Sequence, residues 1–258
     1  MGVADIWQFV ADNKNSIITG VIGSLLAIVL QVVAVVTSNT LTYFLTMRMK
    51  LKRLFSFRSS ANVTVISGSI DQPTSPGLAF LAGPDATAAW NIIKSLQNIY
   101  DQANIKHLYA STALDPSILT DNIVTIGGPV NNSCTKFMLD RVPANVKFDE
   151  DDCLQWDGQS FAKSIDDGVD FGLIARFPNP LSTSKRVLII AGCGTHGVLA
   201  ASRLFENDRR FKQIRDEFNE KRKWTDNFLN RNFMAVIKCN LCGNDTSNLA
   251  VEVVKTIG

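Results

Sequence analysis

The sequence predicts an α/β protein with an N-terminal transmembrane helix and a following layered domain, whose sheet is mainly parallel with antiparallel edge hairpins. Three observations predict this class. An uncharged apolar run occupies residues 17–36. After residue 60, strand-like and helix-like stretches alternate, which is typical of parallel layered sheets. Two later pairs of strand-like stretches are separated by short turn-forming segments, as in antiparallel hairpins.

The apolar run IITGVIGSLLAIVLQVVAVV at 17–36 contains no charged residue. Because a helix rises about 1.5 Å per residue, this length spans a bilayer core of about 30 Å. A buried core helix would normally show a polar face, and a signal peptide would begin with positive charge. The lead-in at 1–16 instead carries two Asp and one Lys. A retained transmembrane helix is therefore the expected structure.

The charges beside this run predict its orientation. The following segment MRMKLKRLFSFR holds five basic residues, Arg48, Lys50, Lys52, Arg53 and Arg58. The positive-inside rule places this flank in the cytoplasm and the N-terminus outside, as a single pass through the inner or cell membrane. The expected division is an extracytoplasmic segment at 1–16, a transmembrane helix and stalk at 17–47, a basic linker at 48–60 and a cytoplasmic domain at 61–258.

Small residues in the helix predict that copies of the chain associate through it. Gly20 and Ser24 are four residues apart, as are Gly23 and Ala27, and such pairs let helix backbones approach closely. Gln31 can hydrogen-bond across a helix interface, and a polar side chain in mid-membrane is costly without a partner. The alternative is that glycine is simply common in membrane helices and that one Gln is tolerated.

The cytoplasmic domain begins with alternating strand-like and helix-like stretches. ANVTVISGS at 61–69, KHLYAS at 106–111 and NIVTI at 122–126 are rich in β-forming residues and predict strands. Apolar residues keep helical spacing over 89–100, and Asp85 stands where the N-cap of that helix is expected. These stretches predict a β-loop-α order and hence a parallel sheet.

The second half of the domain predicts antiparallel additions. VLIIA at 187–191 predicts a buried strand, and GVDFGLIARF at 168–177 predicts its antiparallel partner. The Asp-Gly pair at 157–158 is a hairpin signal. NFMAVIKCNL at 232–241 and LAVEVVKTI at 249–257 predict a terminal hairpin. The expected domain is Rossmann-like with a mixed sheet.

Glycine-bearing loops follow or precede several of these strands. In open α/β sheets, ligands bind outside the carboxyl ends of the strands, so loops at that edge are the candidate binding site. The alternative is that Gly, Pro and Asn only form the turns. The candidate ligand-binding residues are Ser67, Gly68, Ser69, Gly83, Gly127, Gly128, Pro129, Asn131, Asn132, Gly192, Gly194, Thr195, His196 and Gly197.

Two of these loops suggest what the ligand is. GCGTHG at 192–197 precedes a helix, whose N-terminal N–H groups and dipole favour phosphate. Its glycines match G-x-G-x-x-G, but no βαβ unit with an acidic residue follows, so an ordinary dinucleotide-binding domain is not expected. In TIGGPVNN, Asn131 and Asn132 suit hydrogen bonds to a sugar or a base edge.

Few residues support catalysis or metal binding. His196 is the catalytic candidate if the protein is an enzyme, and His107 is expected at a strand start as a surface or capping residue. Cys239 and Cys242 form a CxxC that resembles half of a zinc knuckle. Reduced, buried thiols are the favoured interpretation, so neither a metal nor a cofactor is expected. A net charge of +2 predicts no broad nucleic-acid surface.

With one membrane span and the loops GGPVNN and GCGTHG, the chain resembles bacterial single-span membrane proteins with cytoplasmic Rossmann-like sensor domains of the CARF and SLOG types. The resemblance implies that a nucleotide binds over the glycine loops and that the protein, on sensing it, perturbs the membrane in defence or stress signalling. We therefore expect a homo-oligomeric, membrane-anchored sensor or effector of a nucleotide or phosphate ligand. One alternative is a membrane-tethered enzyme that hydrolyses or transfers a nucleotide or nucleoside. Another is a non-catalytic scaffold.

Overall fold

The computed structural model of the chain describes residues 14–57, 62–71, 79–100, 104–110, 116–206, 209–221 and 232–257. The chain divides into two compact units, Met1–Met49 and Lys50–Gly258. Almost all of the expected extracytoplasmic segment lies outside the described residues, as does Arg58.

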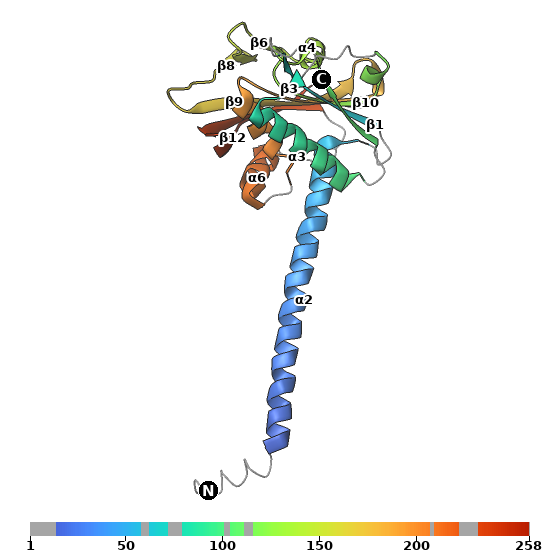
Figure 1. Ribbon diagram of the computed structural model, residues 1–258, viewed down its shortest axis with the longest axis vertical. Coiled ribbons are helices and arrows are strands. Elements are labelled where there is room, and N and C mark those ends of the chain that lie inside the picture. Colours follow the sequence, from blue (N-terminus) through green and yellow to red (C-terminus); the bar gives the residue numbers. More distant parts are fainter. Residues whose placement is uncertain are drawn as a thin grey trace. The chain divides into compact units, whose positions relative to one another are not determined.

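The first unit consists of most of a single long helix, α2 (Lys14–Phe55, 42 residues; Figure 1). Within the described residues, it is the one helix long and apolar enough to cross a membrane, with a mean hydropathy of 1.9 over its apolar window. At about 1.5 Å per residue it is roughly 63 Å long, about twice a bilayer core, so part of it extends beyond any bilayer it crosses. Ser24, Ala27 and Gln31 are exposed on this helix, and Gly20 and Gly23 lie within it.

The second unit is built on a seven-stranded mixed sheet with the order β12-β11-β9-β10-β5-β1-β4. Its parallel part comprises β1 (Asn62–Ser67), β4 (Asn104–Tyr109), β5 (Asn122–Ile126) and β10 (Ser182–Gly192). Its antiparallel part comprises β9 (Val169–Asn179), β11 (Asn232–Cys242) and β12 (Asp245–Ile257). The predicted β9–β10 and β11–β12 pairs are confirmed. They form a contiguous half of the sheet rather than two separate edges.

Both faces of the sheet are covered at its centre, as the burial of every residue of β5 shows. One face carries α3 (Gly83–Ile99) and α5 (Thr195–Arg203), with α6 (Lys212–Lys221) nearby; the other carries α4 (Ser133–Leu139; Figure 1). A small sheet of three short strands lies on the same face as α4. It comprises β6 (Val146–Phe148), β7 (Leu154–Trp156) and β8 (Gln159–Phe161). Minor elements are β2 (Ile70–Asp71), β3 (Ala79–Phe80) and the 3-10 turns at Ile118–Thr120 and Arg209–Phe211.

The predicted Asp-Gly hairpin turn is confirmed between β7 and β8. Asp157 and Gly158 both have positive φ, 50° and 78°, the combination that favours this dipeptide in two-residue hairpins. The hairpin carries Trp156, which is 3% exposed and packs into the core between the sheet and α4. The local turn chemistry therefore positions a large core side chain.

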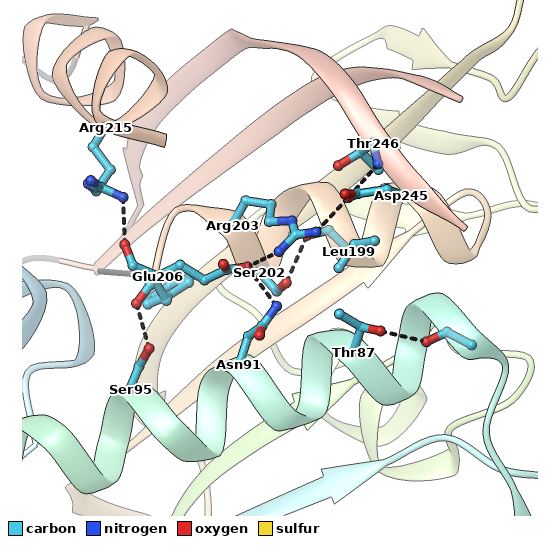
Figure 2. A network of polar contacts seen from close by, with 12 residues as sticks. Thr87, Asn91, Ser95, Leu199, Ser202, Arg203, Glu206, Arg215, Asp245 and Thr246 are labelled. Atoms are coloured by element: carbon cyan, nitrogen blue, oxygen red, sulfur yellow. Dashed lines mark hydrogen bonds and ion pairs between the residues drawn. The ribbon is translucent and has the colours of Figure 1, made fainter. Parts of the chain in front are cut away.

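A polar network joins the helices on the α3 face (Figure 2). Arg203 at the end of α5 forms ion pairs with Glu206 at 2.6 Å and with Asp245 at 2.5 Å. Asn91 of α3 donates to the same Glu206 carboxylate at 2.6 Å, and Arg215 of α6 donates to the Glu206 carbonyl at 2.5 Å. The network therefore fixes α3 and α6 relative to the end of α5.

Candidate functional site

The carboxyl ends of β1, β5 and β10 meet at one edge and bring the glycine loops together. The Gly68 N–H donates to the Ile126 carbonyl at 2.7 Å, and the Ser69 N–H donates to the Asn131 carbonyl at 3.0 Å. The Gly127 N–H donates to the Ile190 carbonyl at 3.0 Å. These bonds place the loops at 67–69, 127–132 and 192–197 side by side, as the parallel strand order requires.

Glycines at this edge allow the backbones of neighbouring loops to approach each other closely. Gly127 has φ of +110°, which side chains rarely adopt, and a Cβ there would lie 3.5 Å from the Gly68 backbone. At Gly68 a Cβ would lie 3.0 Å from the Asn131 carbonyl oxygen, and at Gly128 it would lie 3.3 Å from the Gly192 carbonyl oxygen. Gly83, at the start of α3, has no atom within 4 Å of such a Cβ. Packing between the loops thus explains three of these four glycines.

The structure gives Asn132 a role within the fold. Its side chain is fully buried and donates to the carbonyls of Ile66 at 3.0 Å and Ile126 at 2.9 Å. Its side-chain oxygen Oδ1 accepts from the N–H groups of Cys134 and Thr135 and so caps the N-terminus of α4. The amide thus uses all its ordinary hydrogen-bonding capacity within the protein. Asn before a helix is a common N-cap, so the sequence contained this signal.

The remaining residues of this loop are accessible to different degrees. Asn131 is exposed, Pro129 is half-buried, and Val130 is 72% exposed. Pro129 and Val130 also line an open groove of about 620 Å³ on the α4 side, with Lys136, Lys147 and Phe148 among the other lining residues.

The N-terminus of α5, the predicted phosphate seat, already holds a carboxylate. Asp170 of β9 is fully buried and accepts from the Gly197 N–H in the first turn of α5 at 2.7 Å. Its other oxygen accepts from the Phe171 N–H at 2.7 Å. A helix N-terminus favours an anion, and here the anion belongs to the chain itself. The N–H of Gly197 is therefore not free for a phosphate.

The glycines of this second loop allow α5 to lie directly on the sheet. A Cβ at Gly192 would lie 2.5 Å from the Val198 nitrogen, and one at Gly197 would overlap the Phe171 carbonyl. The half-buried His196 forms a hydrogen bond through Nε2 to the Gly243 carbonyl at 2.6 Å, which joins α5 to the β11–β12 turn. Thr195 is half-buried at the first helical position.

Gly194 leaves room for the side chains of Asp170 and Lys163. A Cβ at Gly194 would lie 2.7 Å from the Asp170 carboxylate and 2.9 Å from Cδ of Lys163. Burial raises the pKa of Asp170, and the N–H bonds and the positive charge of Lys163 act in the opposite direction. The cation and the helix N-terminus thus partly offset the cost of this buried carboxylate.

Asp85 is the residue whose role the sequence did not reveal. It lies in the first turn of α3, since the N-cap is Ala82, and the expected capping role is wrong. Its side chain is 6% exposed, and Oδ1 has no hydrogen-bond partner among the residues that the structure describes. The other oxygen faces Gly127, where a Cβ would lie 3.8 Å away.

The environment of Asp85 favours its neutral form. Burial raises the pKa of this carboxyl to about 7, and the negative charge of Asp170 contributes in the same direction. The strand-end site, as we define it, consists of Asp85, Asp170 and the glycine-bearing loops at 67–69, 127–132 and 192–197. The site is acidic, much of its lining is main chain, and Oδ1 of Asp85 is buried without a hydrogen-bond partner among the described residues.

Ser67, in the first of these loops, contacts His107 beside the site. The Ser67 hydroxyl is 2.9 Å from Nε2 of His107, and Ser67 itself is fully buried. His107 is exposed, as predicted for a surface residue, but it lies within the edge strand β4, opposite Val65, and not at a strand start. Partial burial lowers its pKa, which favours the neutral imidazole as a hydrogen-bonding partner of Ser67.

No metal site is evident in the described part of the chain, where no group of three or more His, Cys, Asp or Glu side chains is placed to hold an ion. Cys239 is buried and Cys242 is exposed. Burial raises the pKa of the Cys193 and Cys239 thiols to about 12, which favours the protonated forms over the thiolates that bind zinc.

Comparison with known protein families and with curated proteins finds no match to this chain. The residues of the strand-end site therefore carry the functional argument. Their arrangement suits a ligand that presents N–H or O–H groups to Asp85 and lies against the glycine backbone.

Proposed function

We propose that the chain is a single-pass membrane-anchored sensor or effector whose Rossmann-like domain binds a nucleotide-type small molecule at the strand-end site. The observation that carries the proposal is Asp85. A buried polar atom without a hydrogen bond costs about 1–3 kcal/mol, and a ligand hydroxyl or amino group would supply the missing donor. Four parallel strands direct their carboxyl ends to this edge, which is where ligands bind in open α/β sheets.

The chemistry of the site favours the nucleoside part of such a ligand. Asp85 and Asp170 are both acidic, and the Gly197 N–H at the α5 N-terminus is already bonded to Asp170. Ribose hydroxyls or an exocyclic amino group would donate to Asp85, whereas a phosphate at the same point would meet like charge. The phosphates of a nucleotide therefore extend away from the two carboxyls in this proposal.

The membrane assignment rests on α2 and on the charges that follow its apolar part. The helix exposes large apolar side chains such as Leu25 and Val33, which suits lipid contact. Lys50, Lys52 and Arg53 near its end support a cytoplasmic second unit by the positive-inside rule. Self-association through Gly20, Gly23, Ser24, Ala27 and Gln31 completes the proposed effector of defence or stress signalling.

Binding is tested on the full-length protein in lipid nanodiscs by thermal unfolding. The probes are adenosine, AMP, NAD, cyclic di-AMP and inorganic phosphate, each at millimolar concentration. A ligand at 100 times its dissociation constant stabilises by about 2.7 kcal/mol, which is several degrees in Tm. We expect at least one nucleoside-containing probe to raise Tm, phosphate to have no effect, and Asp85→Asn to abolish the response. Asp140→Asn, an exposed carboxyl after α4, is the matched control. No response to any nucleoside-containing probe overturns the proposal.

An enzymatic function is favoured by one observation. A carboxyl whose pKa is raised to about 7 exchanges protons readily at neutral pH, as a general acid or base must. If the protein is a nucleotide-hydrolysing enzyme, chromatography after incubation with NAD or AMP will show products that Asp85→Asn abolishes. The earlier catalytic candidate, His196, is tested in parallel as His196→Ala. A sensor binds without turnover, and a scaffold shows neither binding nor turnover.

A further inference from the structure

The last residues of α2, which belong to the second unit, pack in a cluster within that unit that we call the helix-end cluster. Its centre is Arg176 of β9, which is 1% exposed and donates through Nη1 to the carbonyls of Arg53 at 2.6 Å and Leu54 at 2.9 Å. The cluster is completed by Leu51, Leu54, Phe55, Phe57, Tyr100 and Phe205, all buried.

The physical reason for this contact is the end of a helix. The last carbonyls of a helix have no intrahelical partner and carry the negative end of the dipole, so a cation there is favourable. Burial and the nearby Arg186 lower the pKa of Arg176 to about 9, which leaves the guanidinium charged at neutral pH. Its guanidinium also lies 4.8 Å from the centre of the Phe233 ring.

Tyr100 and Phe205 hold the same helix end from two other elements. The Tyr100 hydroxyl accepts from the Phe57 N–H at 3.0 Å and donates to the Lys52 carbonyl at 3.3 Å. The rings of Phe205 and Phe55 lie 4.9 Å apart between centroids. The end of α2 is therefore fixed by main-chain hydrogen bonds as well as by apolar packing.

Three of the elements that contact the helix end also reach the strand-end site. The helix α3 carries Asp85 in its first turn and is followed directly by Tyr100, about 22 Å away at 1.5 Å per residue. The strand β9 carries Asp170 near its start and Arg176 about 20 Å further on, at about 3.3 Å per residue.

The third element is α5. It contributes the Gly197 N–H to Asp170 in its first turn and leads to Phe205 shortly after its end. A bond between Asn91 and Glu206 and one between Ser95 and the Phe205 carbonyl fasten α3 to the end of α5 (Figure 2). Such packed, hydrogen-bonded elements move as units rather than deforming continuously.

We infer that α3, β9 and α5 couple the strand-end site to the end of α2, so that occupation of the site changes how tightly the helix end is held. This inference rests on the proposed function for the identity of the ligand, but its mechanical part does not. A donor bonded to Asp85, or loss of its charge, weakens the repulsion between Asp85 and Asp170. The starts of α3 and β9 then approach, and their far ends shift against Arg53, Leu54 and Phe55.

Hydrogen–deuterium exchange of the full-length protein in nanodiscs tests the coupling without any ligand. At pH 8, above the pKa of about 7, Asp85 of the wild type is ionised, and Asp85→Asn removes this charge while keeping the shape of the side chain. Allosteric coupling between sites is typically about 5- to 150-fold, so we expect exchange over residues 50–57 to slow by at least about fivefold in this variant. Asp140→Asn, the matched exposed carboxyl, should leave exchange there unchanged. Unchanged exchange over 50–57 in Asp85→Asn overturns the inference.

A substitution at the helix end tests whether the coupling also acts from the helix end to the strand-end site. Tyr100→Phe removes only the hydroxyl that bonds Phe57 and Lys52, so the variant should fold. We expect exchange at the first turn of α5 and at residues 83–88 to change about as much as in the forward direction, because coupling is reciprocal. Asp140→Asn again serves as the control. Exchange that changes only around residue 100 contradicts the coupling.

The two proposals fail separately. If adenosine or another nucleotide stabilises the protein but Asp85→Asn leaves exchange over 50–57 unchanged, the binding proposal stands and the coupling is wrong. If Asp85→Asn slows exchange there while no nucleotide binds, the coupling stands and the proposed ligand class is wrong.

Discussion

Replacing Asp85 by Asn should stabilise the protein increasingly as the pH rises. The pKa of this carboxyl is about 7 in the folded protein against an ordinary value of 3.8, chiefly because the side chain is buried. A group whose folded-state pKa is raised favours folding only while protonated. Its contribution is fully present below pH 3.8 and is lost as the pH rises through about 7.

The magnitude follows from the size of the shift. Each unit of pKa difference corresponds to about 1.4 kcal/mol, so ionised Asp85 costs at most about 4 kcal/mol of stability above pH 7. Asn resembles the protonated carboxyl in shape and does not titrate. The free energy of unfolding of Asp85→Asn minus that of the wild type should therefore grow by about 3 kcal/mol between pH 5 and pH 8.

Urea unfolding of the full-length protein in detergent micelles measures this difference, with tryptophan fluorescence, to which the buried Trp156 contributes, as the signal. The stability of the exposed control, Asp140→Asn, should follow the wild type within about 0.5 kcal/mol at every pH. If the curves of stability against pH for the wild type and Asp85→Asn run parallel, Asp85 is not a buried carboxyl of raised pKa. The argument for the strand-end site would then lose its basis.

Three further predictions concern packing, ion pairing and the membrane helix. Arg203→Met should lower the free energy of unfolding by about 3 kcal/mol because it removes the cation that pairs with the nearly buried Glu206 at 2.6 Å. Lys255→Met, at an exposed pair, should cost less than about 1 kcal/mol. Equal urea midpoints for the two variants would contradict this. Gly197→Ala should destabilise the protein by about 3 kcal/mol or more, because the added Cβ overlaps the Phe171 carbonyl. Gly83→Ala, with open space around the added Cβ, should be neutral or stabilising by up to about 1 kcal/mol. A mild effect at Gly197 would show that α5 can move off the sheet. Gln31→Leu should weaken self-association in detergent by about 1 kcal/mol, measured by analytical ultracentrifugation, and an unchanged association constant would exclude a polar seam at that position.

Local patterns in the sequence predicted much of the fold. The apolar run, the alternation of strands and helices in the first half and the three antiparallel hairpins follow from periodicity and turn residues, which act between near neighbours. The Asp157–Gly158 turn shows this best, because positive φ at both positions is a property of the dipeptide itself. The meeting of three glycine loops at one edge also follows, since parallel strands bring their carboxyl ends together.

What the loops do depends on contacts between distant residues. GCGTHG has the composition of a phosphate seat, but Asp170, on the neighbouring strand, provides the anion. Asn131 and Asn132 are adjacent and chemically identical, yet one is exposed and the other is buried as a helix cap.

The sequence by itself determined the secondary structure, the mixed sheet and the edge where a ligand is sought, because these depend on short-range preferences. Only the tertiary structure showed that Asp85 is buried with an oxygen available, and that Arg176 bonds the end of α2 from more than 100 residues away. Burial and long-range hydrogen bonding arise when the whole chain is packed, and the charge and accessibility of each site residue follow from them.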